Sequence, residues 1–255
     1  MSALRARCPN CRTLTAVAFD DGYECHSCGR TFAAGLVRVP RAWGAGGEAM
    51  AAAASLDLPY PEALVVEAGT LDEQSAALAA GLPARPLVVG GCCCAHVGAI
   101  RGLAARHDRL AVVWLDAHGD LNTPETSPSG NLWGMPLRMA IDEGSVRPAD
   151  VALVGARDLD PPELTYVAEQ GIDADVGRAL ADADAVYVAL DVDVLAPGSV
   201  PPCFMPVAGG PTAAEVEAVL RDVAARGRVA GLGLTGLGEE AQPAHLAGFV
   251  AAAGL

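Results

Sequence analysis

The sequence predicts an α/β protein with three layers, α/β/α, in which helices cover both faces of a mainly parallel sheet, and a small module precedes it. The chain has 255 residues, of which 52% are hydrophobic and 19% charged, enough to bury one large core. Short apolar runs alternate with alanine-rich helical stretches, as expected for strands covered on both faces. Paired cysteines stand apart from this pattern near the start. We therefore expect a module over residues 1–35 and an α/β domain over residues 36–255.

The N-terminal module carries two C-x2-C pairs. Residues 8–28 read CPNCRTLTAVAFDDGYECHSC, with thirteen residues between the pairs. This spacing resembles a zinc ribbon, in which four thiolates close a tetrahedral site. The segment has almost no core of its own, so one structural Zn²⁺ would supply its folding energy. Two disulfides, or a ribbon that has lost its metal, are the alternatives. The expected zinc ligands are Cys8, Cys11, Cys25 and Cys28.

Six apolar runs are expected to be strands, and four stretches between them to be helices. The strands are ALVVE (63–67), PLVV (86–89), LAVVWL (110–115), VALV (151–154), VYVAL (186–190) and VAGLGL (229–234). The helices are residues 71–80, 95–106, 174–182 and 213–226. Thr212 and Glu215 form a capping-box pattern at the start of the last helix.

Three of these strands lead directly into polar or cysteine-rich clusters. GGCCCAH, DAHGD and DVD follow the strands that begin at residues 86, 110 and 186. Ligands of open α/β sheets gather beyond the carboxyl ends of the strands, so these clusters are expected to converge. Four carboxylates in one site repel each other unless cations neutralise them, and so many ligands favour two divalent ions. Each motif taken alone could be a turn or a helix cap. The converging residues are Asp116, His118, Asp120, Asp191 and Asp193.

LDAHGDLNTPETSPSGN (115–131) resembles the central motif of the ureohydrolases, the arginase–agmatinase family of binuclear manganese enzymes. ALDVDVLAP resembles the second aspartate motif of that family, VGGCCCAHVGA its Gly-Gly-Asp-His-Ser segment, and GARDLDPPE a further arginase segment. The resemblance implies an arginase-like fold and two Mn²⁺ ions. Asp116 and Asp191 would bridge them, His118 and Asp193 would complete one ion, and Asp120 would complete the other.

The same resemblance assigns a substrate-binding end to the site. Asn122, Ser129 and Asn131 match positions that hold the α-carboxylate of the substrate in arginases, and Asp160 matches one that meets the α-amino group. The residues from Asp160 to Glu163 also read as a helix start, with an N-cap, a proline at the first position and a capping-box glutamate. Both interpretations of Asp160 stay open.

Two departures from the family pattern concern the metal ligands. Cys93 stands where the family has its first metal-binding His, and Cys92 replaces the preceding Asp. A thiolate is softer than imidazole and shifts preference from manganese toward zinc or iron, so one ion is either replaced or weakly held. His96 could substitute as a ligand if the segment is already helical there. Alternatively, Cys92, Cys93 and Cys94 are small buried side chains at a tight turn.

Two further departures concern the substrate. Trp133 occupies the position of a family His that transfers protons; it either stacks on a planar cation or fills space. We place it with Asp120 among the catalytic residues. The acidic residue that meets the guanidinium in the family would fall near Gly236, with Glu239 and Glu240 close behind. GLGLTG also matches a dinucleotide-binding pattern, but no clear helix follows it, so that function is not expected.

The expected function is a metal-dependent hydrolase of a linear guanidino or amidino compound, in which metal-bound hydroxide attacks the planar carbon. The alternative is a catalytically degenerate ureohydrolase fold that binds metal or ligand while the ribbon recruits a partner. Because every basic side chain is Arg, Schiff-base chemistry and a P-loop lysine are excluded.

The overall charge and the apolar pattern narrow the partners. A net charge of −14 argues against nucleic acid as the main partner. Apolar runs break before the ~18 residues that a membrane span needs. The start, MSALRARCPN, lacks the apolar core of a signal peptide, so a cytoplasmic location is expected. By analogy with the family, we expect a homo-oligomer.

Overall fold

The computed structural model describes residues 4–199 and 203–255, so residues 1–3 of the expected N-terminal module lie outside it. Its centre is a seven-stranded sheet with the order β6-β5-β7-β11-β10-β8-β9, in which every paired neighbour is parallel. The expected parallel sheet is confirmed. In chain order the strands are β5 (Gly35–Val39), β6 (Glu62–Val65), β7 (Pro86–Gly90), β8 (Leu110–Leu115), β9 (Val151–Val154), β10 (Ala185–Asp191) and β11 (Val229–Thr235).

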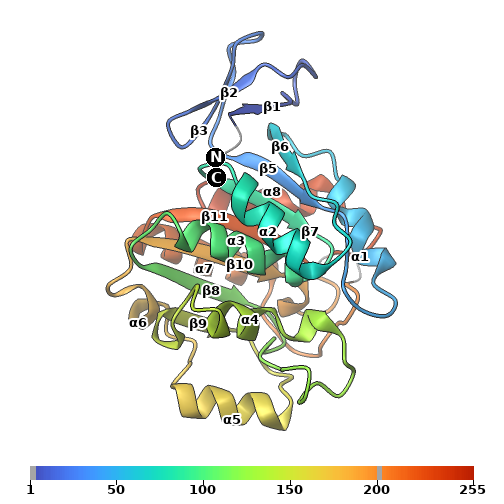
Figure 1. The fold of residues 1–255 in the computed structure, drawn as a ribbon, viewed down its shortest axis with the longest axis vertical. Helices are drawn as coiled ribbons and strands as arrows, with labels where there is room; N and C mark the ends of the chain where they lie inside the picture. The colour runs from blue at the N-terminus through green and yellow to red at the C-terminus, as the bar shows by residue number, and fades with distance from the viewer. Residues whose placement is uncertain (1–3, 200–202) are drawn as a thin grey trace.

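Helices cover both faces of this sheet, which confirms the three layers (Figure 1). Side chains of α2, α3 and α4 pack into the hydrophobic core on one face, and side chains of α7 and α8 into the core on the other. The helices are α1 (Glu48–Ala52), α2 (Leu71–Gly81), α3 (Cys94–Ala104), α4 (Pro136–Asp142), α5 (Pro161–Gln170), α6 (Val176–Leu180), α7 (Ala213–Arg226) and α8 (Pro243–Ala252).

Strand β10 shows why the apolar runs are continuous. All seven of its residues are buried, because it lies between β8 and β11 and carries helices on both faces. Buried parallel strands of this kind lack the alternation of polar and apolar residues found in half-exposed strands. The capping box at the start of α7 is confirmed, since the Glu215 amide donates to Thr212 Oγ1 at 3.3 Å and the Thr212 amide donates to Glu215 Oε2 at 2.8 Å.

Several elements were not among those predicted. Strand β5 was not predicted because Arg38 interrupts its apolar run. The guanidinium of Arg38 donates to the carboxylate of Glu62 on β6 at 2.7 Å. Helices α1, α4, α5 and α8 also escaped, although the helix-start interpretation of Asp160 to Glu163 is confirmed by α5, which begins at Pro161.

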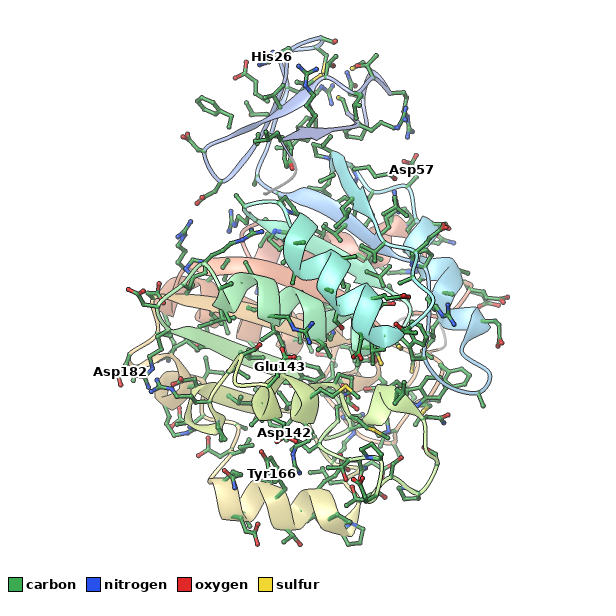
Figure 2. The ribbon with its side chains drawn as sticks, viewed as in Figure 1. His26, Asp57, Asp142, Glu143, Tyr166 and Asp182 are labelled. Atoms are coloured by element: carbon green, nitrogen blue, oxygen red, sulfur yellow. The ribbon has the colours of Figure 1, made fainter. Side chains whose placement is uncertain are left out.

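The N-terminal module is a separate antiparallel sheet of four strands: β1 (Arg5–Ala6), β2 (Ala16–Phe19), β3 (Gly22–Cys25) and β4 (Thr31–Phe32). It lies beside β6, the edge strand of the large sheet, where Arg7 and Glu62 exchange two backbone hydrogen bonds of 2.9 Å. Figure 2 shows His26 at the end of the module that faces away from the large sheet. The module thus covers an edge that would otherwise expose unpaired backbone groups.

None of the helices in the described ranges combines the length and the apolarity that crossing a membrane requires.

Candidate metal centre and substrate pocket

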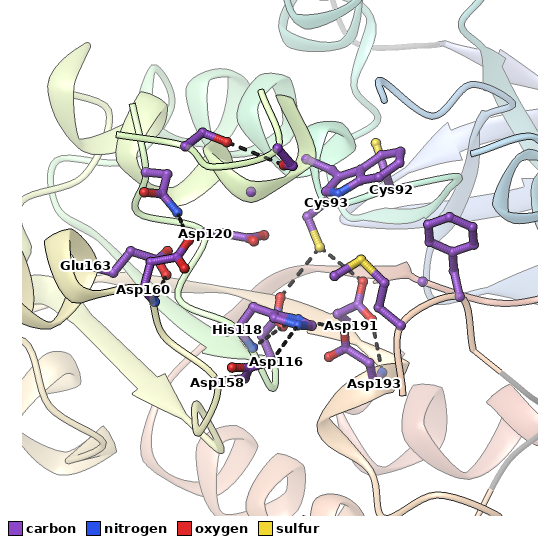
Figure 3. Close-up of a pocket in the computed structure, with 18 of the residues that line it drawn as sticks. Cys92, Cys93, Asp116, His118, Asp120, Asp158, Asp160, Glu163, Asp191 and Asp193 are labelled. Carbon is purple, nitrogen blue, oxygen red and sulfur yellow. Dashed lines mark hydrogen bonds and ion pairs between the residues drawn. The ribbon is translucent and has the colours of Figure 1, made fainter. Parts of the chain in front are cut away.

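The polar clusters do converge at the carboxyl edge of the large sheet. Four consecutive strands of the sheet lead into the site, in the order β7, β11, β10 and β8. Each strand is followed by a segment that contributes residues to the site. Because all four strands are parallel, their carboxyl ends meet at one edge. A cavity of about 290 Å³ opens at this edge. Its lining includes all six expected sheet-edge ligands, Cys93, Asp116, His118, Asp120, Asp191 and Asp193 (Figure 3).

The first group of potential ligands is Cys93, Asp116 and Asp120, one atom of each lying within 4.8 Å of the others. Cys93 precedes α3, and its Sγ lies 3.6 Å from Asp116 Oδ2 and 3.1 Å from Asp191 Oδ2. The thiol therefore points toward the carboxylates, where a metal ligand would have to lie. All of these residues are buried, as are Cys92 and Cys94 on either side.

The second group is Asp116, His118 and Asp193. His118 Nδ1 lies 3.0 Å from Asp193 Oδ2 and 3.5 Å from Asp116 Oδ1. Backbone amides fix both carboxylates: the His118 amide donates to Asp116 Oδ1 at 2.7 Å, and the Ala117 amide donates to Asp193 Oδ1 at 3.0 Å. Asp116 belongs to both groups, as expected for a carboxylate that bridges two ions.

Burial and mutual repulsion disfavour the charged form of these carboxylates. Burial, reinforced by Asp193, raises the pKa of Asp191 to about 7, and burial together with Asp116 raises the pKa of Asp193 to about 6. Burial opposes protonation of His118, but its interactions with Asp116 and Asp193 outweigh burial and raise the His118 pKa to about 11. A divalent ion placed among these groups would replace the protons that they otherwise keep.

Asp120 provides the clearest test of whether the residues fit metal ions. Its Oδ2 is buried and has no hydrogen-bond partner, which is costly for a carboxylate unless a cation meets it. Its backbone has a φ of 52°, in the left-handed region, a strained conformation that persists where the surrounding structure demands it. The donor set of four carboxylates, one imidazole and one thiol fits divalent ions.

A buried hydrogen-bond network connects the metal centre to the interior of the protein. Thr235, the last residue of β11, donates its hydroxyl to Asp191 Oδ2 at 3.0 Å. His96 lies 3.2 Å from Thr235 Oγ1 through Nε2 and 2.9 Å from the Tyr187 hydroxyl through Nδ1. Both ring nitrogens of His96 are thus occupied, and His96 belongs to neither ligand group formed by the described residues. The suggestion that it replaces the missing His ligand is not supported.

The predicted substrate-binding residues divide into two sets. Asn122 and Asp160 meet directly, since Asn122 Nδ2 donates to Asp160 Oδ2 at 2.8 Å, and both line the cavity with Ser129. Asn131 instead accepts a hydrogen bond from the Ala45 amide at 3.0 Å and lines a neighbouring hollow. Its side chain therefore positions the loop around residue 45.

Glu163 also lines the cavity, although its sequence pattern indicates only a helix cap. Its two carboxylate oxygens accept from the amides of Leu121 and Asp160, each at 2.8 Å. It thereby ties α5 to the loop that follows β8, and a Cβ on Gly119 would lie only 2.9 Å from it. The capping-box pattern was the signal, but the contact with Leu121 comes from the tertiary fold.

Trp133 forms one wall of the cavity. It packs against the glycines of the loop before α1, where a Cβ on Gly44 would lie 2.2 Å from its ring, and it meets Phe204 edge-on with 5.5 Å between centroids. Trp133 therefore fills space on one side while it lines the cavity on another. Phe204 and Met205 also line it, and nothing in their local sequence indicated this.

Gly236 lines the cavity with a φ of 71°, and a Cβ there would lie 2.0 Å from Asp191 Oδ1. An acidic side chain at this position would thus collide with the metal centre. Glu239 and Glu240 are exposed and do not take its place among the lining residues described.

The cysteines of the N-terminal module form a second, separate cluster. Cys8, Cys11, Cys25 and Cys28 each offer a sulfur within 4.8 Å of the others, with 3.8 Å between Cys8 and Cys28 and 3.6 Å between Cys11 and Cys25. A hydrogen bond with Thr15 lowers the pKa of Cys25 to about 6. None of these cysteines is in a disulfide.

The protein is a three-layer α/β/α fold with an all-parallel central sheet. Carboxylates, an imidazole and a thiol gather at the carboxyl edge of that sheet, which is the arrangement of an α/β metalloprotein. The sequence profile of the Arginase family matches residues 48–243, and the chain belongs to this family. It is 37% identical to arginase of Bacillus subtilis (strain 168) over 153 residues, 49% of this chain and 52% of that protein. It is 35% identical to arginase of Bacillus caldovelox over 156 residues, 50% of this chain and 52% of that protein.

The aligned part of this chain spans about half the length of these two curated relatives. Among solved structures, arginase from Bacillus subtilis superimposes with a TM-score of 0.72 and 25% identity, covering 86% of this chain and 95% of that one. The proclavaminate amidino hydrolase of Streptomyces clavuligerus shares the fold, with a TM-score of 0.68 and 22% identity over 86% and 88% of the two chains.

Proposed function

We propose that this protein is a metal-dependent hydrolase that cleaves a C–N bond of a linear guanidino or amidino compound. Membership of the arginase family and similarity to bacterial arginases support the reaction class. The observation that carries the proposal is the pair of ligand groups joined by Asp116, with the unpartnered Asp120 Oδ2 beside them. Two divalent ions bound there would supply an activated water and stabilise developing negative charge.

The chain's own residues would then orient the substrate. Asn122, Asp160 and Ser129 line the cavity, and their amide, carboxylate and hydroxyl groups suit the charged groups of an amino-acid-like tail. Trp133 offers a flat aromatic surface on which a planar cation can stack, worth about 0.5–2 kcal/mol. Asp120 has a free carboxylate oxygen that can bind an ion or accept a proton.

The cavity disfavours arginine itself as the substrate. The position that carries an acidic guanidinium anchor in the resemblance is Gly236, where no side chain fits beside Asp191. Trp133 cannot exchange protons near neutral pH, so it cannot replace a proton-transferring His. We therefore infer a substrate whose planar group is held by stacking and by the metal centre. Manganese is the family ion, with zinc or iron as replacements.

The N-terminal residues 1–35 are proposed to be a zinc-ribbon module with a structural role, separate from a ureohydrolase-like domain of residues 36–255. The four sulfurs are close enough to share one ion, and thiolates favour zinc over manganese. Assembly into a homo-oligomer remains a prediction from family analogy, and a small molecule is the proposed binding partner.

A screen of arginine, guanidino acids, guanidino amines and formamidines tests the hydrolase. The chain would be loaded in turn with manganese, zinc or ferrous iron, and urea, ammonia or amide release would be measured. We expect turnover of at least one compound. Asp116→Asn should lower kcat/KM by more than the roughly 10–100-fold that is typical when a residue supporting a metal ligand is changed.

Asp182→Asn is the matched control, because the exposed Asp182 pairs with Arg109 at 2.6 Å and is not among the residues that line the cavity. It should stay within about threefold of wild type, as expected for a weak surface ion pair. A folded, metal-loaded protein that turns over none of these classes would overturn the proposal and favour a degenerate fold that only binds ligand.

A further inference from the structure

We propose that the two ion positions are chemically unequal: the position formed by Cys93, Asp116 and Asp120 selects a soft divalent ion, zinc or ferrous iron. The position formed by Asp116, His118 and Asp193 lacks sulfur and discriminates less against manganese. The centre would then hold a mixed metal pair. This inference rests on the proposed two-ion centre, but it can be tested without turnover.

The orientation of Cys93 distinguishes it from a packing cysteine. Its sulfur lies 3.1 Å from Asp191 Oδ2 and 3.6 Å from Asp116 Oδ2, and the Thr235 hydroxyl lies 3.4 Å away. A thiol has only one proton to share between two carboxylates. A cation in place of that proton would attract both of them and the sulfur together.

The neighbouring Cys92 provides an internal comparison. It is equally buried, but its sulfur accepts a hydrogen bond from the Trp43 amide at 3.3 Å and belongs to neither ligand group. Two adjacent cysteines in the same turn therefore have different surroundings. One faces the carboxylates, whereas the other faces the backbone of the loop before α1.

The donor sets also differ in charge. With its thiolate, the Cys93 position would offer three negative donors, whereas the His118 position offers two carboxylates and one neutral imidazole. Sulfur is a soft ligand that favours zinc and iron, and carboxylates suit manganese. His96 cannot equalise the two positions, because Thr235 and Tyr187 occupy both of its ring nitrogens.

Cobalt(II) reports thiolate ligation directly, through its near-ultraviolet sulfur-to-cobalt charge-transfer absorption. Full-length wild type, Cys93→Ser and Cys92→Ser would be stripped of metal and reloaded with cobalt. The N-terminal module contributes four thiolates to every spectrum, so Cys93→Ser should lose about one fifth of the absorption. Cys92→Ser should match wild type. Identical spectra for wild type and Cys93→Ser would overturn the inference.

Cys93→His gives a second measurement that stands if the serine variant fails to fold. Purified wild type and Cys93→His would be equilibrated with equal concentrations of zinc and manganese and analysed for metal content. After the one zinc expected in the N-terminal module is subtracted from both, the manganese-to-zinc ratio should rise at least twofold in Cys93→His, because both positions would then accept manganese. An unchanged ratio would contradict the inference.

The outcomes separate this inference from the hydrolase proposal. Turnover together with cobalt spectra that do not depend on Cys93 would leave the hydrolase in place and reject the unequal pair. A Cys93-dependent spectrum in a protein that hydrolyses no guanidino or amidino compound would retain the unequal pair and reject the hydrolase.

Discussion

The two cysteine-containing clusters of this protein are built in opposite ways. The N-terminal cluster draws its four sulfurs from 21 consecutive residues and lies in a small core of five buried described residues, two of which are its own cysteines. The sheet-edge cluster draws its ligands from residues 93 to 193, and the large core beneath fixes their positions. On the proposed assignments, the first would depend on metal for its fold, whereas the second is held together by the fold at the expense of buried charge repulsion.

The largest effect should come from removing one sulfur of the N-terminal cluster. Cys25→Ser should abolish zinc binding by the module, because such sites supply roughly 10 kcal/mol or more to modules of this size. Amide protons of β2 and β3 should then exchange nearly as fast as in an unfolded chain. The protection of β8 and β10 should persist, and turnover should stay within about threefold of wild type.

Cys203→Ser is the control for that experiment, since Cys203 is a half-buried thiol outside both clusters formed by the described residues. Hydrogen exchange measured by mass spectrometry reports both regions at once. If Cys25→Ser also removed protection from β10, the two regions would be one cooperative unit, and the contrast drawn above would be wrong.

The same contrast explains how much could be predicted from the sequence. The N-terminal cluster could be read from spacing, because its ligands are neighbours along the chain. The sheet-edge cluster could also be predicted, because Asp116 follows β8, Asp191 ends β10, and the parallel order of the strands brings their ends together. Both depend on rules that local sequence obeys.

The walls of the cavity could not be predicted in this way. Trp133 packs on a loop about ninety positions earlier in the chain, and Phe204 meets it from a segment with no regular structure. The hydrogen bond between Asn131 and the Ala45 amide likewise joins residues 86 positions apart. Contacts of this kind depend on loop geometry, which leaves no periodic signal in sequence.

A smaller loss of stability is expected from two glycine substitutions, and comparing them distinguishes backbone strain from crowding in the sheet-edge cluster. Gly236 and Gly130 have nearly the same φ, 71° and 68°, but a Cβ on Gly130 would meet nothing within 4 Å. Gly130→Ala should therefore lower the free energy of unfolding by only about 1–2 kcal/mol. Gly236→Ala should lower it by roughly 2–4 kcal/mol, because the methyl group also displaces Asp191.

Urea denaturation of the two variants measures this difference, and metal titration shows whether the displaced carboxylate weakens binding. Equal losses of stability would mean that Asp191 moves aside freely. In that case an acidic residue could be accommodated at position 236, and the argument against arginine as a substrate would weaken.

Thr235→Val tests whether the buried network orients a ligand. Valine keeps the shape but removes the hydroxyl that donates to Asp191 Oδ2 at 3.0 Å. The affinity for the ions should fall by about 10–100-fold, the usual effect of losing such a support. Tyr187→Phe acts one hydrogen bond further away, through His96, and should change the affinity by less. Equal effects of the two variants would assign the network to packing alone.

The smallest predicted effect concerns pH, and its sign follows from the raised pKa values. In the metal-free fold, Asp191 and Asp193 keep their protons up to about pH 7 and 6, whereas an unfolded chain releases them near pH 4. His118 likewise stays protonated up to about pH 11, against an ordinary value near 6.5. The folded state therefore holds more protons, and the stability of the metal-free protein falls as pH rises through this range.

Manganese should remove most of this loss, because it displaces the same protons. Added manganese should therefore raise Tm more at about pH 7.5 than at about pH 5, by a few degrees for a chain of this size. The measurement is best made in the Cys25→Ser background, where metal bound by the N-terminal cluster no longer contributes. A manganese-induced rise that is equal at both pH values, or larger at the lower one, would mean that these carboxylates do not form the site. The repulsion assigned to the sheet-edge cluster would then need another source of compensation within the fold.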